Sequence, residues 1–157
     1  MKGRTPLKTT NSLTPEMTTR LNRSPLISLI TVDTESLRPQ INAISWIRAN
    51  NEEQKIRIAV GHQSECLANM EKGSPVTLGW MDIKDYYIMS GPTTLSELKK
   101  GTMKYRIIEM AIESMDNVMF YGGEISQIPL YTKTYDPELA KKIDQEIEQA
   151  LEEGWSK

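Results

Sequence analysis

Residues 55–80, KIRIAVGHQSECLANMEKGSPVTLGW, decide how the rest of this chain is interpreted. Gly61 and Ser64 divide the stretch. The part before Gly61 alternates with a period of two, which is typical of a half-buried strand whose inner face carries Ile56, Ile58 and Val60. After the glycine, the Ser64 hydroxyl can cap a short helix by accepting from a free backbone N–H group. The first half therefore predicts a strand, a turn and a helix start.

The second half completes the short helix and begins another strand. Leu67 and Met70 are three residues apart and would share one apolar face of the helix. Gly73 stands where a helix C-terminus favours glycine, and Ser74-Pro75 leads into the next strand. A turn that opens onto a helix N-terminus can hold an anion such as phosphate, but most caps hold none. Ser64 is therefore either a phosphate ligand or a plain cap.

The order of these elements resembles the pyridoxamine 5′-phosphate oxidase-like family of FMN-binding split barrels. The resemblance rests on a strand, then Ser-x-x-x-x-Asn-Met on a short helix, then Pro-Val-Thr-Leu, and it extends from about Leu21 to Gly123. It implies a mainly β fold with flanking helices, built as a six-stranded antiparallel split β-barrel of the FMN-binding type. It also implies a homodimer, because members of this family build the flavin site across a two-fold interface.

The resemblance also implies which residues would bind FMN. Ser64 and Asn69 match positions on the phosphate side of the cofactor. Apart from the resemblance, His62 stands just before the cap, where it is either a further hydrogen-bond partner for a phosphate or a solvated turn residue. Two strand segments would run under the cofactor and meet the edge of its ring, and they comprise Ala59, Val60, Gly61, Ile44, Ser45 and Trp46. In such proteins the flavin ring supplies the redox chemistry, and the protein binds and orients it.

Three positions depart from the family pattern. The oxidase proper has cations that grip the phosphate, whereas the matching positions here are Asn42, Glu65 and Cys66. An acid beside a phosphate is repulsive unless it points away. The C-terminal substrate-binding motif of the oxidase, with its tryptophan and arginines, is not visible. We therefore expect an FMN-binding protein, a flavin-dependent oxidoreductase of unknown substrate, and not a true pyridoxamine 5′-phosphate oxidase.

Other interpretations stay open at this point. Cations elsewhere could compensate, and those near in sequence are His62, Arg48, Arg57 and Lys72, although such residues are more often solvated surface charges. Alternatively, the chain is a cofactor-free split-barrel dimer that binds another ligand or a protein. Haem binding would depend on His62, the single histidine. The sequence identifies no catalytic residue and does not decide whether the protein is an enzyme.

Composition narrows the class of protein. A chain of 157 residues suits one domain, and a formal charge of −2 gives no basic field for a nucleic-acid partner. One cysteine and one histidine leave no intrachain disulfide and no Cys- or His-cluster metal site. No apolar run is long enough to cross a bilayer, and the N-terminus lacks the apolar core of a secretory signal. We therefore expect no membrane partner and a cytoplasmic location.

Along the chain, we expect a flexible N-terminus over residues 1–13 and a single split-barrel domain over residues 14–157. A helix would start at Thr14-Pro15 and end near Asn22. Strands are expected at 25–32 (covered on both faces), 39–48, 55–61, 76–81, 86–90 and 118–121. Residues 93–100 would form a helical turn or a polar loop. Residues 103–115 fit a helix or a strand, and the resemblance favours a strand in their first half.

The C-terminal segment predicts a helix over residues 137–153. Asp136 and Pro137 form a cap and a first helical position, and apolar residues recur at helical spacing at Leu139, Ile143, Ile147, Ala150 and Leu151. The preferred interpretation is a surface helix that packs on its own barrel. The alternative is a helix that supports a dimer or covers a pocket together with Trp155.

Overall fold

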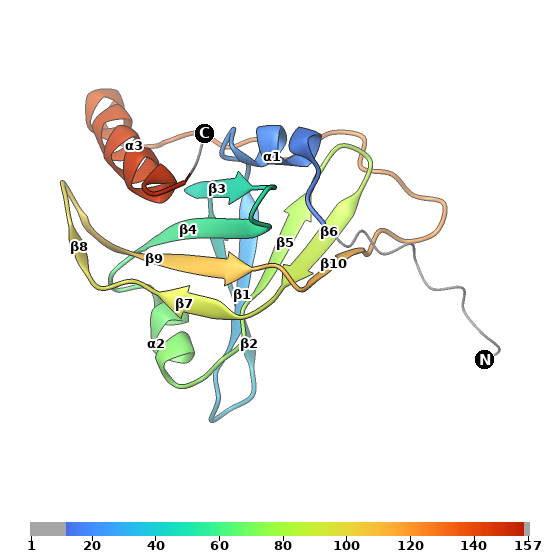
Figure 1. Ribbon diagram of the computed structural model, residues 1–157, viewed down its shortest axis with the longest axis horizontal. Coiled ribbons are helices and arrows are strands. Elements are labelled where there is room, and N and C mark those ends of the chain that lie inside the picture. The colour runs from blue at the N-terminus through green and yellow to red at the C-terminus, as the bar shows by residue number, and fades with distance from the viewer. Residues whose placement is uncertain (1–11, 156–157) are drawn as a thin grey trace.

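The structure is a computed structural model that describes residues 12–155. Two antiparallel β-sheets form its centre, and helices flank them (Figure 1). The predicted flexible N-terminus lies almost wholly outside the described residues. Within them, Leu13 is buried, and both its N–H and its C=O hydrogen-bond the Gln54 side chain. Ordered packing therefore begins by residue 13, because these bonds fix the backbone there.

The strands divide evenly between the two sheets. The first sheet has the order β10-β6-β5-β1-β2 and comprises β1 (Ile27–Val32), β2 (Pro39–Ile44), β5 (Thr77–Met81), β6 (Tyr86–Ser90) and β10 (Ser114–Asn117). The second has the order β3-β4-β9-β7, with β8 also paired to β9, and comprises β3 (Ile47–Asn50), β4 (Lys55–Gly61), β7 (Thr93–Leu95), β8 (Lys99–Lys100) and β9 (Lys104–Ala111). The expected mainly β fold is confirmed, and closure into a six-stranded barrel stays a prediction.

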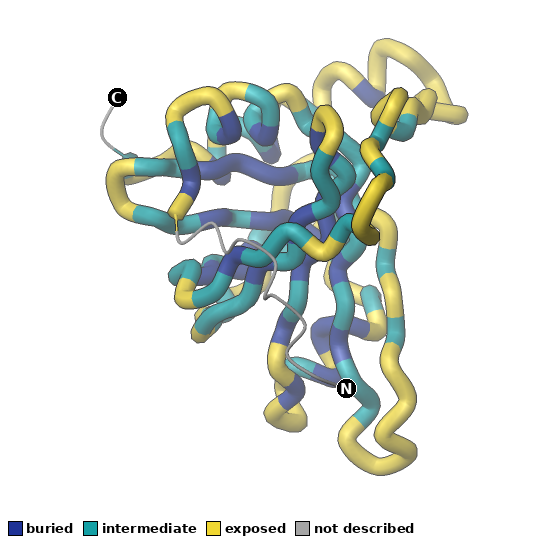
Figure 2. The backbone as a smooth tube through the Cα atoms, turned by 90° about the vertical axis from the view of Figure 1, so that its right-hand side faces the viewer, coloured by how far each residue is buried: buried dark blue, intermediate teal, exposed yellow. Residues whose placement is uncertain are grey.

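The main core lies between the two sheets. Ile56, Ile58 and Val60 of β4 face it, as the alternation predicts, and Trp80 of β5 joins them. In Figure 2 the buried segments run through the strands of both sheets, and the loops around them are exposed. Ala59, on the opposite face of β4, belongs to a second and smaller apolar cluster. β4 is therefore covered on both faces, which holds its C-terminal end in a fixed position.

Three helices close the structure. α1 (Pro15–Leu21) starts at the predicted Thr14 cap and contacts β3, and α2 (Glu65–Glu71) contacts β1 and β2. α3 (Pro137–Glu152) lies on the outer face of the second sheet, against β3 and β4 (Figure 1). The inward position predicted for Leu139 is wrong, because the helix turns the smaller Ala140 toward the sheet and leaves Leu139 40% exposed.

Residues 39–48 form two strands, so the single strand predicted there is wrong. β2 pairs with β1 in the first sheet, β3 pairs with β4 in the second, and Ser45 and Trp46 between them belong to neither. The chain changes sheets at these two residues. Trp46 lies directly beside β4, because the N–H of Ala59 donates to the carbonyl oxygen of Trp46 at 3.0 Å.

Four further segments test the sequence predictions. Residues 93–100 contain the short strands β7 and β8, not a helical turn or loop, because the long β9 offers them an edge. The strand interpretation of residues 103–115 is confirmed by β9. The strand predicted at 118–121 is wrong, since β10 ends at Asn117, and Phe120 and Tyr121 are 69% and 100% exposed. The expectation that strand 25–32 is covered on both faces is also wrong, because β1 alternates buried and half-buried residues.

Among the helices of residues 12–155, none is long and apolar enough to cross a membrane. The two longer loops of the first sheet follow β1 and β10. The second of these, residues 118–136, links β10 to α3 and is called the connector below. Its backbone meets the first sheet at two places. The N–H of Val118 donates to the carbonyl oxygen of Tyr86 in β6 at 2.7 Å, and an isolated bridge joins Ile125 to Lys84 in the turn between β5 and β6.

Candidate functional site

A pocket of about 280 Å³ lies where the chain passes from β2 to β3 and where β4 ends. Its walls are formed by Asn42, Ala43, Ile44, Ser45, Trp46, Ala59, Val60, Gly61, Ser64, Lys133 and Tyr135, and we call it the junction pocket. Seven of the nine residues predicted to bind a cofactor are among these, namely Ile44, Ser45, Trp46, Ala59, Val60, Gly61 and Ser64. The fold therefore brings together two strand segments that the sequence separates.

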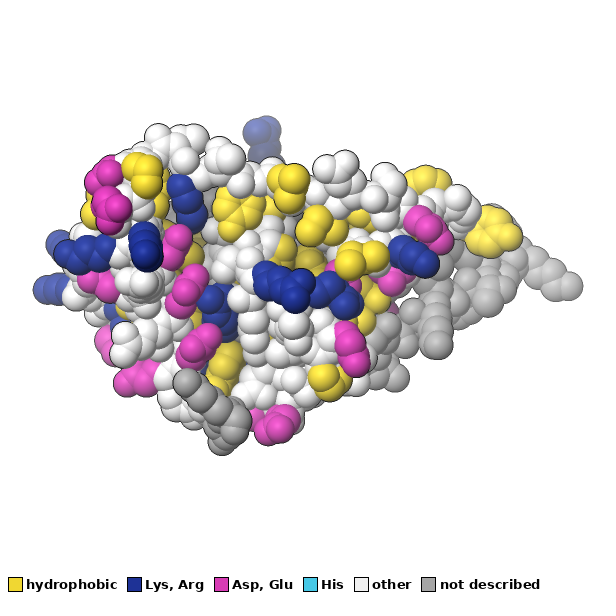
Figure 3. Space-filling view, turned by 90° about the horizontal axis from the view of Figure 1, so that it is seen from above, with side chains coloured by type: hydrophobic (Ala, Val, Ile, Leu, Met, Phe, Trp, Pro, Cys, Tyr) yellow, Lys and Arg dark blue, Asp and Glu magenta, His cyan; other side chains and the backbone are white. Residues whose placement is uncertain are grey.

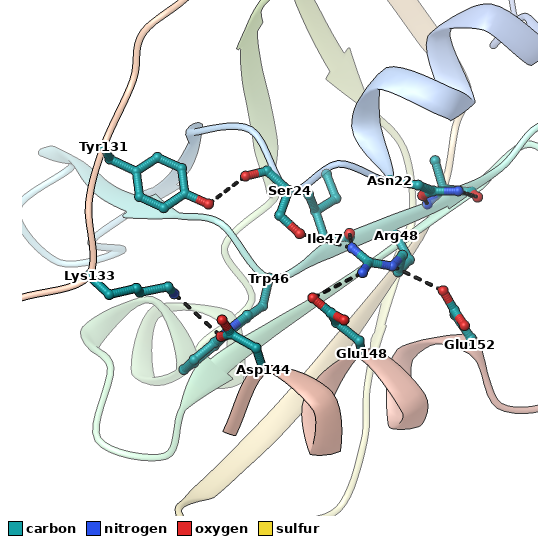
Figure 4. Close-up of polar contacts among 11 residues, drawn as sticks. Asn22, Ser24, Trp46, Ile47, Arg48, Tyr131, Lys133, Asp144, Glu148 and Glu152 are labelled. Carbon is teal, nitrogen blue, oxygen red and sulfur yellow. Dashed lines mark hydrogen bonds and ion pairs between the residues drawn. The ribbon is translucent and has the colours of Figure 1, made fainter. Parts of the chain in front are cut away.

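The backbone of the β2–β3 crossing holds Trp46 against this pocket. Its carbonyl oxygen accepts from the N–H of Ala59, and its indole N–H donates to Asp144 Oδ1 of α3 at 2.8 Å (Figure 4). The side chain is half-buried and packs on the apolar cluster beneath α3. Trp46 is therefore fixed at both its backbone and its ring, so it forms a rigid flat wall.

Ser64 occupies the N-cap position of α2, but its side chain makes no capping hydrogen bond, so that part of the prediction is wrong. Its hydroxyl oxygen instead lies 3.2 Å from the Cys66 sulfur, which is a weak hydrogen-bond partner. Cys66 is fully buried, and burial raises the pKa of its thiol. The thiol therefore stays neutral near pH 7, and the Ser64 hydroxyl keeps capacity to bind a ligand in the pocket.

The other two predicted residues lie outside the pocket walls. Asn69 is buried, and its amide nitrogen donates to Thr31 Oγ1 and Gln40 Oε1, each at 3.0 Å. This side chain ties α2 to β1 and β2, because both strands supply one of its acceptors. His62 is exposed, and its Nδ1 lies 3.3 Å from the carbonyl oxygen of Lys104. Nothing in this arrangement marks His62 as a haem ligand.

The acid beside the cap points away from the pocket. The Glu65 carboxylate accepts a hydrogen bond of 2.6 Å from the Gln40 side chain and does not line the junction pocket. Gln40 in turn accepts from Asn69, so the position of Glu65 is set by a chain of side-chain contacts. The repulsion expected between Glu65 and an anion in the pocket is therefore weaker than the sequence suggests.

Asn42 contributes a polar atom without a partner. Its Oδ1 is buried and makes no hydrogen bond to any residue that the structure describes, and the residue lines the junction pocket. Leaving a buried acceptor unpaired costs about 1–3 kcal/mol, so such an atom marks a place where a ligand can donate an N–H or O–H. The neutral Asn42 is therefore suited to a hydroxyl or amide donor and not to an anion.

Sequence reasoning missed Lys133 and Tyr135, which line the pocket from the connector. The Lys133 ammonium lies 3.5 Å from Asp144 Oδ1 and 5.2 Å from the centre of the Trp46 ring (Figure 4). The connector has no helical or strand periodicity, and Lys133 and Tyr135 are more than 70 positions beyond the end of β4. The ion pair between Lys133 and Asp144 of α3 is the feature that links Lys133 to the pocket, but it forms only in the folded chain and cannot be recognised from the sequence.

A second pocket of about 270 Å³ lies where α1 meets β5 and the connector, and we call it the joint pocket. Its walls include Arg20, Arg23, Ser24, Asp82 and Tyr131, together with Trp80, Ile83 and residues 128–130. Arg20 donates two hydrogen bonds to the Asp82 carboxylate, at 2.7 and 2.8 Å, and the Tyr131 hydroxyl donates to the carbonyl oxygen of Ser24 at 2.6 Å. Arg20 and Asp82 therefore satisfy each other, as do Tyr131 and Ser24, while the exposed Arg23 makes no side-chain bond within the described residues.

A metal centre finds no support in residues 12–155. No group of three or more His, Cys, Asp or Glu side chains in this part of the chain is placed to hold a metal ion. The three cationic residues that the sequence offered besides His62 each lie near a carboxylate outside the junction pocket. Arg48 pairs with Glu148 and Glu152, Arg57 pairs with Glu109, and Lys72 lies near Glu35.

No family model and no curated protein matches this chain. Solved structures do match. A Lactobacillus delbrueckii protein provisionally described as a pyridoxamine 5′-phosphate oxidase has a TM-score of 0.57 at 20% identity, covering 69% of this chain and 98% of that chain. HupZ of Group A Streptococcus has a TM-score of 0.56 at 16% identity, covering 73% and 99%. A variant of HupZ scores 0.55. The chain thus has the fold of the pyridoxamine 5′-phosphate oxidase-like split-barrel proteins.

Proposed function

We propose that this protein binds FMN in the junction pocket and acts as a flavin-dependent oxidoreductase whose substrate is not a pyridoxamine phosphate. The observation that carries the proposal is the convergence of three groups on one pocket: the flat ring of Trp46, the unpartnered Oδ1 of Asn42, and the Ser64 hydroxyl, whose one side-chain contact is the weak one to the Cys66 sulfur. The fold that the chain shares with an oxidase-like protein supports the same ligand class.

The residues of the pocket fit the parts of a flavin nucleotide. Trp46 offers a flat wall for an aromatic ring, Asn42 Oδ1 an acceptor for a hydroxyl or ring N–H, and Ser64 a hydroxyl for a phosphate or a ribityl oxygen. When bound, the flavin ring would supply the electron transfer. The protein's share is to bind and orient the ring. No catalytic residue is proposed, because the pocket walls hold no pair of titratable groups in contact.

We further propose that the active form is a homodimer with a split-barrel core. Ligand pockets usually measure about 300–1,000 Å³, and the junction pocket, at about 280 Å³, lies just below that range. A second copy could supply the remaining wall. The outer face of β1 and β2 beside the pocket carries apolar side chains that a second copy could cover, and Ile41 there is 65% exposed.

An absorption spectrum of the purified protein, followed by titration with FMN while flavin fluorescence is recorded, tests the proposal. We expect a flavin band or saturable quenching, together with elution as a dimer in size-exclusion chromatography. A colourless protein that leaves FMN fluorescence unchanged would overturn the proposal. The urea-unfolded protein is the control, because it keeps the tryptophans but has no pocket.

One observation favours the second candidate, a cofactor-free split-barrel dimer that binds another ligand or a protein. Lys133 and Tyr135 of the chain's own connector form part of the pocket wall, so side chains of the protein occupy space that a cofactor could use. The same titration separates the two functions. Absence of flavin binding together with dimeric elution would favour this candidate, and a bound flavin would exclude it.

A further inference from the structure

We infer that Lys133 makes the junction pocket selective for ligands that carry an anionic group such as a phosphate. The inference rests on the proposed function, in that it names the residue that recognises the charge of the nucleotide. Positions 42, 65 and 66, where the related oxidases carry cations, are Asn, Glu and Cys in this chain. The positive charge comes instead from the connector, which follows the last strand of the first sheet.

Lys133 is the only charged residue among the eleven that line the junction pocket. An anion that leaves water for a partly buried site needs a paired charge, because hydrogen bonds from neutral groups replace only part of its hydration. On the face drawn in Figure 3, acidic and basic side chains are mixed where α3 lies, and no broad basic patch is seen there. The local cation therefore decides which ligands enter.

The Lys133 ammonium is available to a ligand. Its distance of 3.5 Å to Asp144 Oδ1 is longer than the 2.7–2.9 Å of a charge-assisted hydrogen bond, and that oxygen already accepts the Trp46 indole N–H at 2.8 Å. The remaining contacts are with the rings of Trp46 and Tyr131, at 5.2 and 5.9 Å to their centres, and such contacts are weak when partly exposed. The side chain is 31% exposed, so the ammonium can turn to a ligand without breaking a strong bond.

The stretch of connector that carries Lys133 is held at both ends. On one side, the Tyr131 hydroxyl bonds to Ser24 before β1 (Figure 4). On the other, α3 begins at Pro137, and Arg48 of β3 binds its Glu148 and Glu152 at 3.2 and 3.1 Å. A lysine between two such anchors is placed beside the pocket before any ligand binds. Less conformational entropy is therefore lost when a ligand binds.

A comparison of two ligands with the same ring tests this inference. FMN and riboflavin differ by the phosphate, so their dissociation constants are measured by flavin fluorescence for the wild type and for Lys133→Met, Lys133→Arg and Lys142→Met. We expect Lys133→Met to weaken FMN about 10- to 100-fold and riboflavin less than about twofold, as for loss of one charged hydrogen bond. Lys133→Arg should keep most of the preference for FMN. Lys142, exposed on α3 and outside the pocket, is the matched control for loss of one positive charge.

Each outcome bears on the inference. An equal loss of both ligands in Lys133→Met would mean that the side chain only shapes the pocket, and an unchanged FMN affinity would mean that it does not contact the phosphate; either result overturns the inference. If the wild type binds neither flavin, the proposed function fails by itself. Inorganic phosphate then decides: a saturable shift of the Trp46 indole N–H resonance in the wild type, absent from Lys133→Met, supports the inference, and no shift overturns it.

Discussion

Residues of the connector line both the junction pocket and the joint pocket, which have almost equal volumes. The two pockets differ in whether their polar side chains have hydrogen-bond partners. In the joint pocket, Arg20 and Asp82 share two short hydrogen bonds, and the Tyr131 hydroxyl is bonded to Ser24. In the junction pocket, two residues away along the connector, Lys133 makes a long ion pair and two weak ring contacts, and Asn42 Oδ1 has no partner in the described residues. Volume does not distinguish them, at about 270 and 280 Å³.

The difference indicates separate roles. Polar groups that satisfy one another gain nothing from a ligand, so the joint pocket acts as a structural contact between α1, β5 and the connector. Polar groups left unsatisfied cost free energy until a ligand or water arrives, so the junction pocket is the candidate binding site. This contrast predicts that changes in the joint pocket alter stability and that changes in the junction pocket alter affinity.

The largest effect is expected from Arg20→Met in the joint pocket. Asp82 is 3% exposed, and without its partner the carboxylate would be buried and unpaired, which should cost about 3 kcal/mol of unfolding free energy. Urea unfolding followed by circular dichroism measures this loss. FMN affinity should not change in the folded variant. Arg23→Met is the control, because Arg23 is exposed and lines the same pocket. A comparable loss in Arg23→Met would show that charge in general, and not the Asp82 pair, stabilises this contact.

Tyr87, whose ring packs on Trp80 of the joint pocket wall, predicts a dependence on alkaline pH. Burial, followed by the hydrogen bond to Asp85 and the nearby carboxylates, raises the pKa of Tyr87 to about 12 from the ordinary 10.0. Because the folded-state pKa is the higher one, this stabilising contribution is complete below about pH 10 and is lost as the pH rises toward 12. The phenolate absorbance of the wild type should therefore show a late step that Tyr87→Phe lacks. A step of equal size and position in both proteins would contradict the prediction.

In the junction pocket, Ser64→Ala should weaken FMN about fivefold and change the unfolding free energy by less than about 0.5 kcal/mol, because its hydroxyl does not cap α2. Thr14→Ala is the matched control. The Thr14 hydroxyl does cap α1, accepting from the N–H of Met17 at 3.2 Å, so its loss should cost about 1 kcal/mol and leave FMN affinity unchanged. Fluorescence titration and urea unfolding of both variants check that Ser64→Ala changes FMN affinity alone and that Thr14→Ala changes stability alone. Unchanged FMN affinity in Ser64→Ala would remove that hydroxyl from the site.

The local sequence pattern predicts most of the helices and strands, because their formation depends mainly on residues that are neighbours in the sequence. The alternation of β4 and the glycine that ends α2 both follow from backbone geometry, and the structure contains them where the pattern indicates. The change of sheet at Ser45 and Trp46 has no such signal, since neither glycine nor proline marks it. Only the pairing of β2 with β1 and of β3 with β4 separates the two halves of that segment.

The candidate site is predictable only in part for the same reason. Asn69 matches a family position, but Thr31 and Gln40 take its amide donors, and both lie on distant strands. Lys133 belongs to a connector without periodicity, positioned by a hydrogen bond between residues 107 apart in the chain. Side chains whose positions depend on such long-range bonds cannot be placed from spacing, so the sequence indicates the pocket's strands and omits its charge.

The smallest effect, and the one that refines the contrast most, is expected from Asp144→Asn. Asp144 competes with an anionic ligand for Lys133, at 3.5 Å, and its own charge repels that ligand. An asparagine oxygen can still accept the Trp46 indole N–H, so the ring should stay in place. FMN affinity should therefore rise about two- to fivefold, the size expected for one partly exposed ion pair, and riboflavin affinity should stay constant. Glu138→Gln, an exposed acid in the first turn of α3, controls for the change in net charge. A fall in FMN affinity in Asp144→Asn would instead show that Asp144 positions Lys133 for the ligand. The long ion pair between these two residues would then help to bind the ligand and would not compete with it.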